Sequence, residues 1–187
     1  METLTQDDIL NHEDLKSSVD VVKQVSNGIR GYVCHEMIHI LYVLKELMGD
    51  DCKNYLEIGT HNGGSIMTVM QSKYNTKFYG VDVWGGDINR LYAQENITKH
   101  NKHQHDFELI KGNSMSDDTF NKVVTKCPSV DFLFIDGGHN YDNVINDFNR
   151  YSKLVNPGGL IVFDDYLMFE RPNINIDYNV SFILQKI

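Results

Sequence analysis

The 187-residue sequence predicts an α/β fold in which helices cover both faces of a doubly wound, mainly parallel sheet. The first observation behind this prediction is that five short apolar runs alternate with segments whose apolar residues recur at helical spacing. The second is that polar residues stand at or just beyond the end of each run. Sheets of this kind bind ligands outside the carboxyl ends of their strands, where the strand order reverses. We therefore expect the polar chemistry to gather along one edge of the sheet.

The chain is expected to begin with a helical extension, residues 1–50, followed by the α/β domain, residues 51–187. Residues 1–30 are polar and loosely patterned, and Gly28 and Gly31 end this lead-in. Residues 34–48 form a strongly apolar helix whose apolar side chains cover much of its circumference. Such a helix is expected to pack against other elements on more than one side.

The alternation of strands and helices begins after Gly49. The expected strands are residues 55–59, 78–82, 107–111, 130–135 and 160–163. The expected helices are residues 63–73, 88–100, 117–125 and a segment that begins near Tyr141. This last helix has the clearest pattern, and Asn140 or Asp142 is its expected N-cap. Its apolar stripe consists of Tyr141, Val144, Ile145, Phe148, Tyr151 and Leu154.

Composition narrows the classes of partner. The chain has 17 basic and 26 acidic residues and a net charge of -9, with no basic patch, which argues against a nucleic-acid partner. The three cysteines, Cys34, Cys52 and Cys127, are far apart and odd in number, which favours free thiols in a reducing compartment. The acidic first 20 residues do not resemble a signal peptide, and no stretch is long enough to span a membrane. A cytoplasmic protein without membrane contact is therefore expected.

The turn between the first strand and its helix is rich in glycine. Gly59, Gly63 and Gly64 allow a tight turn and the close approach of a ligand, because they carry no Cβ atom. The helix that follows directs its free N–H groups toward the same place. By itself this turn is a weak signal, since many nucleotide-binding proteins have one.

Further motifs make the signal specific. Glu57-x-Gly59-x-x-x-Gly63 resembles the first motif of the class I S-adenosylmethionine-dependent methyltransferases, and Asp82 resembles their ribose-binding acid. A narrower resemblance, to the metal-dependent small-molecule O-methyltransferases related to macrocin O-methyltransferase, depends on four segments. These are Asp82-x-Trp84-x-Gly86-Asp87, Phe134-Ile135-Asp136-Gly137-Gly138-His139, Pro157-Gly158-Gly159 and Phe163-Asp164-Asp165-Tyr166. Together the motifs cover residues 54–166.

The resemblance implies a Rossmann-like methyltransferase fold and the transfer of a methyl group from S-adenosylmethionine to a hydroxyl of a small molecule, such as a sugar or natural product, assisted by Mg²⁺. It implies His139 as the base and Asp136 as a second catalytic residue. The implied metal ligands are Asp136, Asp164 and Asp165. The implied cofactor-binding residues are Glu57, Gly59, Gly63, Ser65, Asp82, Asn113, Ser114 and Asp136.

The chemistry of these residue types agrees with such roles. A carboxylate at position 82 can accept hydrogen bonds from two vicinal hydroxyls of a nucleoside. Three carboxylates at adjacent strand ends are hard oxygen ligands of the kind that Mg²⁺ prefers. A histidine three residues after Asp136 is placed to take a proton from the acceptor hydroxyl.

Structural alternatives exist for several of these residues. Gly63 and Gly64 could serve close packing of the helix on the strand, and Asp164 with Asp165 could form a turn or cap without an ion. Asp82 could equally bind the ribose of NAD, although the Gly-x-Gly-x-x-Gly spacing is absent.

Two alternative functions also remain open. His35-Glu36-Met37-Ile38-His39 fits the H-E-x-x-H pattern of zinc hydrolases, with Glu57 as a conceivable third ligand. Only residues 167–187 follow the fifth strand, enough for one more strand at about 179–184, so the C-terminal part is short for this class. A homo-oligomer would then cover the exposed sheet edge, or the chain would be an inactive, cofactor-binding interaction module.

Overall fold

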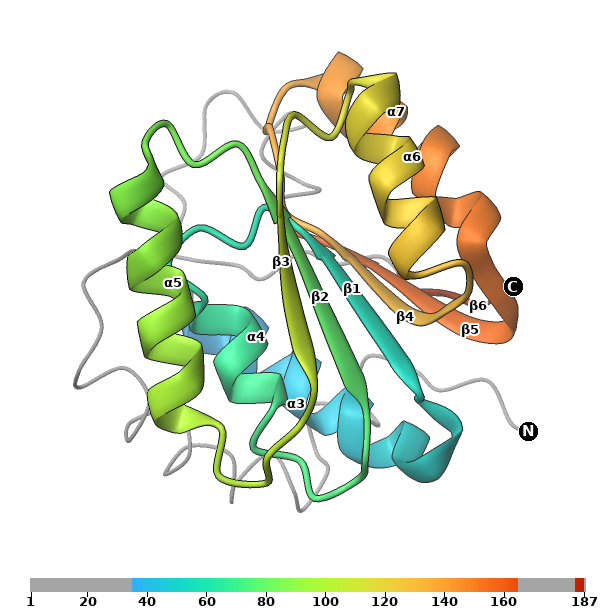
Figure 1. Cartoon of the computed structure of the whole chain (residues 1–187). Coiled ribbons are helices and arrows are strands. Elements are labelled where there is room, and N and C mark those ends of the chain that lie inside the picture. The colour runs from blue at the N-terminus through green and yellow to red at the C-terminus, as the bar shows by residue number, and fades with distance from the viewer. Residues whose placement is uncertain (1–34, 165–183, 187) are drawn as a thin grey trace, which may run out of the picture.

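The computed structural model describes residues 35–164 and 184–186, which form a six-stranded sheet with helices on both faces (Figure 1). The strands are β1 (Asn54–Ile58), β2 (Lys77–Asp82), β3 (Phe107–Lys111), β4 (Val130–Ile135), β5 (Val155–Phe163) and β6 (Leu184–Lys186). The helices are α3 (His35–Met48), α4 (Gly64–Val69), α5 (Asp87–His100), α6 (Asp117–Lys126) and α7 (Tyr141–Tyr151), with short 3-10 turns η1 (Gly49–Asp51) and η2 (Ser152–Leu154). The predicted α/β class is confirmed.

The strand order is β3-β2-β1-β4-β5-β6, and all neighbours are parallel except β5 and β6. The chain first builds outward from β1 through β2 to β3, then returns to the other side of β1 with β4. The strand order therefore reverses between β1 and β4, which is where a doubly wound sheet binds its ligands.

Two apolar cores form because successive side chains of a strand point to opposite faces of the sheet. Tyr55 and Phe78 belong to the core beneath α3, α4 and α5, whereas Leu56 and Val81 belong to the core beneath α6 and α7. Figure 1 shows these two helical layers on either side of the strands. The central strands β1 and β4 are buried on both faces, and this explains why they read as apolar runs.

Helix α3 packs as its pattern predicted. Its buried apolar residues are Met37, Ile38, Ile40, Leu41, Val43 and Leu44. Most of them share one core with β1 and α4, so this helix is continuous with the α/β domain. The domain boundary at residue 50 stays a prediction, and residues 1–30 lie outside the described part of the chain.

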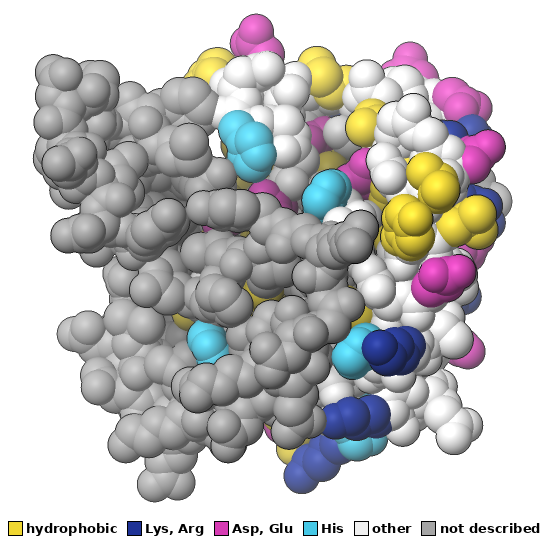
Figure 2. Space-filling model, turned by 90° about the vertical axis from the view of Figure 1, so that its left-hand side faces the viewer, with side chains coloured by type: hydrophobic (Ala, Val, Ile, Leu, Met, Phe, Trp, Pro, Cys, Tyr) yellow, Lys and Arg dark blue, Asp and Glu magenta, His cyan; other side chains and the backbone are white. Residues whose placement is uncertain are grey.

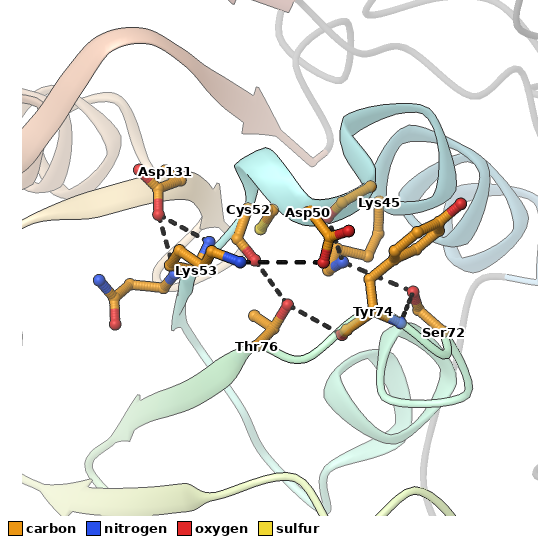
Figure 3. A network of polar contacts seen from close by, with 10 residues as sticks. Lys45, Asp50, Cys52, Lys53, Ser72, Tyr74, Thr76 and Asp131 are labelled. Carbon is orange, nitrogen blue, oxygen red and sulfur yellow. Dashed lines mark hydrogen bonds and ion pairs between the residues drawn. The ribbon is translucent and has the colours of Figure 1, made fainter.

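A polar network closes the amino-terminal end of the sheet, opposite the candidate site (Figure 3). The buried Lys45 amine donates to the carbonyl of Gly49 at 3.2 Å and to Ser72 Oγ at 3.5 Å, and it lies 5.3 Å from the centre of the Tyr74 ring. Burial lowers the pKa of Lys45. The Thr76 hydroxyl donates to the carbonyl of Cys52 at 2.6 Å. These bonds satisfy polar groups that would otherwise be costly to bury.

Two boundaries, the end of α4 and the start of β5, differ from the predictions by several residues. Helix α4 ends at Val69 rather than near residue 73, because Gln71 and Ser72 donate their backbone N–H groups to carbonyls three residues back, which tightens the chain into turns. Strand β5 begins at Val155 rather than at residue 160, because Val155 already pairs with Val130 before a shift in register.

The additional strand expected at about 179–184 is found at Leu184–Lys186, antiparallel to β5. It therefore pairs with the outer side of β5. A homo-oligomer at the sheet edge stays a prediction. Among the described residues, no helix combines the length and apolar character needed to cross a bilayer. The cytoplasmic location also stays a prediction.

Candidate active site

Glycine is required at two positions of the turn after β1. Gly59 has a φ of +97°, and a Cβ atom there would overlap the carbonyl oxygen of Asp136 in the loop after β4. Gly63 has a φ of +82°, and a Cβ atom would lie 2.9 Å from Cγ1 of Ile97 in α5. Contacts within the protein thus account for both glycines, although Gly63 packs against a side chain of α5 and not against a strand, as the packing alternative had it. Their cofactor-binding role stays a prediction.

Glu57 joins β1 to the start of α4. It is fully buried, and its carboxylate accepts hydrogen bonds from the Tyr55 hydroxyl at 2.8 Å and from Ser65 Oγ at 2.7 Å. Both sequence-predicted residues, Glu57 and Ser65, therefore bond to each other across the glycine turn. Desolvation raises the pKa of Glu57 to about 7, although the two hydroxyl donors oppose this rise.

The raised pKa of Glu57 predicts a loss of stability as the pH rises. Between an unfolded pKa near 4.5 and a folded pKa near 7, only the folded state holds this proton, so the free energy of unfolding falls with increasing pH. For this residue the fall is on the order of 3 kcal/mol. Glu57→Gln should remove most of this pH dependence, because glutamine does not titrate. Its amide can still form hydrogen bonds with both hydroxyls, so the fold should tolerate the change.

Urea unfolding of the wild type and of Glu57→Gln at pH 5 and pH 8 measures this effect. The wild type should lose more stability than the variant between the two pH values. An identical pH dependence in both proteins would show that Glu57 keeps an ordinary pKa.

Asp82, at the end of β2, is fixed by the backbone of two loops. Its Oδ2 accepts from the backbone N–H of His61, and its Oδ1 accepts from that of Trp84, each at 2.8 Å. The indole N–H of Trp84 in turn donates to the carbonyl of His61 at 2.7 Å. The carboxylate is thus held in one orientation beside the loop after β1, one strand away from the place where the strand order reverses.

The loop after β3 lies beside Asp82, whose carbonyl accepts from the N–H of Gly112 at 2.9 Å. In this loop the Asn113 side chain accepts from the N–H of Met115 at 3.0 Å. The carbonyl of Ser114 accepts from the Tyr151 hydroxyl, also at 3.0 Å. The sequence-predicted residues Asn113 and Ser114 therefore stand in an ordered loop next to the acid.

Asp147 is a buried acid that the sequence prediction missed. It is only 1% exposed, and a Cβ atom at Gly137 would lie 3.0 Å from its Oδ2. Within the described part of the chain, neither carboxylate oxygen has a hydrogen-bond partner. Burial raises the pKa of Asp147 to about 6, against the opposing effects of Ser114 and Arg150. The sequence offered one signal for this burial. Asp147 stands three residues after Val144 and four before Tyr151, which places it on the same side of α7 as the apolar stripe.

The ends of β4 and β5 bring two of the predicted metal ligands side by side. The N–H of Asp164 donates to the carbonyl of Ile135 at 3.0 Å, and this carbonyl directly precedes Asp136. Asp165 lies outside the described residues. Within the described part of the chain, no group of three or more His, Cys, Asp or Glu side chains could hold a metal ion.

His139 stands in the loop between Asp136 and α7. The loop packs tightly on that helix, because a Cβ atom at Gly138 would overlap the amide of Asn143. Asn140 caps the helix by accepting from the N–H of Asn143 at 2.9 Å, which confirms the first of the two predicted caps. His139 is exposed, beside the ends of the strands.

The zinc-hydrolase alternative gains no support. Both His35 and His39 lie on α3, but the side chain of His35 is outside the described set. The conceivable third ligand, Glu57, is buried and engaged by Tyr55 and Ser65.

Exposed apolar side chains border the site on the side of α5, where Figure 2 shows them gathered. They are Val83, Ile88, Leu91 and Tyr92, each more than half exposed. Only Ala93 and Ile97 of this helix are buried, so α5 contributes little to the core.

Comparison with known proteins identifies a family whose match spans the elements that carry this site. A family profile described as a methyltransferase domain matches residues 56–166, from β1 to just past β5. The chain belongs to this methyltransferase family. The predicted class I S-adenosylmethionine-dependent methyltransferase fold is thereby confirmed.

Individual relatives support the same placement. Uncharacterized protein R132 of Acanthamoeba polyphaga mimivirus is 40% identical over 147 residues, which are 77% of this chain and 65% of that protein. The chain thus spans slightly less than two thirds of this relative.

Solved structures share the fold. An O-methyltransferase from Bacillus cereus in complex with SAH gives a TM-score of 0.62 at 23% identity, covering 90% of this chain and 76% of that one. MycE methyltransferase from the mycinamycin biosynthetic pathway, in complex with Mg and SAH, gives 0.59 at 18% identity, covering 87% and 42%. At these identities the likeness concerns the fold.

Proposed function

We propose that this chain is an S-adenosylmethionine-dependent O-methyltransferase that acts on a hydroxyl of a small molecule, such as a sugar or natural product, with help from Mg²⁺. The observation that carries the proposal is the carboxylate of Asp82, oriented by two backbone N–H groups beside the glycine turn at the strand-order reversal. Membership of the methyltransferase family supports it.

Asp82 is the proposed acceptor for the two ribose hydroxyls of the cofactor. A carboxylate has about four acceptor positions, and the backbone of His61 and Trp84 uses two of them. The loops that carry Gly59, Gly63, Asn113, Ser114 and Asp136 would surround the rest of the cofactor. Glu57 and Ser65 would stabilise the glycine turn, because their hydrogen bond joins β1 to the start of α4. When bound, S-adenosylmethionine supplies a methyl group on a positively charged sulfur.

We propose Asp136 and Asp164 as magnesium ligands, because carboxylate oxygens are the ligands that Mg²⁺ prefers. The backbone bond between Asp164 and Ile135, which brings the two strand ends together, supports this proposal. We propose Asp165 as the third ligand. When bound, Mg²⁺ would hold the acceptor hydroxyl and lower its pKa.

His139 is the proposed general base. From its place after Asp136 it would take the proton of the acceptor hydroxyl when that oxygen receives the methyl group and the methyl–sulfur bond of the cofactor breaks. The exposed ring would release this proton to solvent afterwards.

The ribose role of Asp82 predicts a loss of cofactor affinity in Asp82→Ala. The binding free energy of S-adenosylhomocysteine should weaken by about 1–3 kcal/mol, because charge-assisted hydrogen bonds to the ribose are lost. Asp87→Ala is the matched control, since this acid is exposed and pairs with Lys111. Equal affinity in the wild type and Asp82→Ala would argue against the ribose role.

Methyl transfer itself tests the proposal. Purified protein is incubated with S-adenosylmethionine that carries a labelled methyl group and with a panel of hydroxylated sugars and natural products, in Mg²⁺ or in EDTA. Labelled product that forms only with Mg²⁺ is expected. Cofactor binding without product across the panel would favour the inactive interaction module.

A further inference from the structure

Trp84 closes a ring of three hydrogen bonds around the carboxylate of Asp82. Asp82 Oδ2 accepts from the N–H of His61, the carbonyl of His61 accepts from the indole of Trp84, and the N–H of Trp84 donates to Asp82 Oδ1. We call these three residues the Asp82 latch. The latch joins the loop after β1 to the loop after β2, so neither loop can move without breaking a bond.

The backbone of the latch is held in a costly conformation. His61 has a φ of +44° and Trp84 a φ of +32°, both in the left-handed region that non-glycine residues rarely adopt. Such conformations persist where the surroundings determine them, and they concentrate at ligand sites. Trp84 is only 2% exposed and belongs to the core beneath α5, which anchors the latch.

Apart from the Asp82 carboxylate, the latch uses one side chain, the indole of Trp84, which donates to the carbonyl of His61. The His61 peptide donates to Asp82 through its N–H, and the carbonyl of the same residue receives the indole N–H. Losing the indole bond therefore releases the donor that orients Asp82 Oδ2. The lone pairs that the latch leaves open would then no longer point in a fixed direction.

We infer that Trp84 is a positioning residue for ribose recognition: its indole N–H holds the His61 peptide so that Asp82 presents its free lone pairs to a pair of vicinal hydroxyls. The inference rests on the proposed function. It assigns to Trp84 a part in ligand selectivity, beyond packing.

The test exploits the single tryptophan of the chain. Growth of a tryptophan auxotroph on β-(3-benzothienyl)alanine replaces Trp84 alone with a residue of nearly the same shape that has sulfur in place of the indole N–H. Trp84→Phe is the genetic counterpart. Ile97→Val is the matched control, because it trims the same core and leaves the latch intact.

Calorimetry then measures the affinity of each protein for S-adenosylhomocysteine and for its 2′-deoxy analogue. Loss of one oriented hydrogen bond should weaken S-adenosylhomocysteine binding about tenfold and change the binding of the analogue little. The preference for the ribose hydroxyl should therefore fall about tenfold in both Trp84 replacements. Ile97→Val should keep the wild-type preference.

Two results would overturn the inference alone. One is an unchanged preference in the replaced proteins, and the other is an equal loss of affinity for both ligands, which would mean that Trp84 only supports packing. If the wild type itself binds neither ligand, the proposed function fails, and the inference fails with it.

Discussion

Gly59→Ala is expected to destabilise the fold by about 3 kcal/mol, the largest effect of any single methyl group in the site. The alanine Cβ would overlap the carbonyl oxygen of Asp136, and the residue would have to keep a φ of +97°. Backbone atoms on both sides leave no flexible side chain to yield. Urea unfolding of the variant measures the loss in free energy of unfolding.

Gly158→Ala separates the effect of the steric overlap from the effect of the positive φ. Gly158 has a φ of +87°, but a Cβ atom there meets nothing within 4 Å. Its loss should be about 1 kcal/mol, from the backbone conformation alone. If both variants lost the same stability, the close approach of the Gly59 and Asp136 loops would not be the reason for the glycine.

His139→Ala is expected to slow turnover by roughly 10²–10⁴-fold, the usual contribution of a positioned general base. Affinity for S-adenosylhomocysteine should hardly change, because the proposed role concerns the acceptor proton. Steady-state methyl transfer to an acceptor found in the panel gives the first quantity, and calorimetry gives the second.

His103→Ala provides a histidine control, since His103 is exposed near the opposite end of α5. It should leave turnover unchanged. Turnover in His139→Ala equal to that of the wild type would require another base. A matching fall in cofactor affinity would instead mean that His139 shapes the cofactor site.

Strand positions were predictable because burial on both faces leaves a strong trace in the sequence. The predicted strands 107–111 and 130–135 match β3 and β4 in their bounds. Their parallel order then places residues such as Asp82 and Asp136 at one edge, since all five strands end on the same side.

Features that depend on contacts between distant segments were not predictable. The early end of α4 reflects local turns and the Gln71 side chain, which donates to carbonyls of Met67 and His100. The early start of β5 reflects pairing with Val130. The spacing of apolar residues gives no sign of the contact between Gln71 and His100 or of the pairing between Val155 and Val130.

Within the site, the acids were predictable but their partners were not. The motif that contains Asp82 also contains Trp84, yet spacing gives no sign that its indole reaches the carbonyl of His61. The bond between Ser65 and Glu57 likewise depends on how α4 sits over β1. Residue types at strand ends can suggest a chemistry, whereas the geometry that orients them comes from tertiary packing.

Titration of the purified protein with S-adenosylhomocysteine, with and without Mg²⁺, tests the central claim most directly. The account predicts calorimetric binding in the micromolar range with one site per chain, because backbone N–H groups of two loops hold the Asp82 carboxylate in one orientation. Absence of binding in both conditions would contradict it.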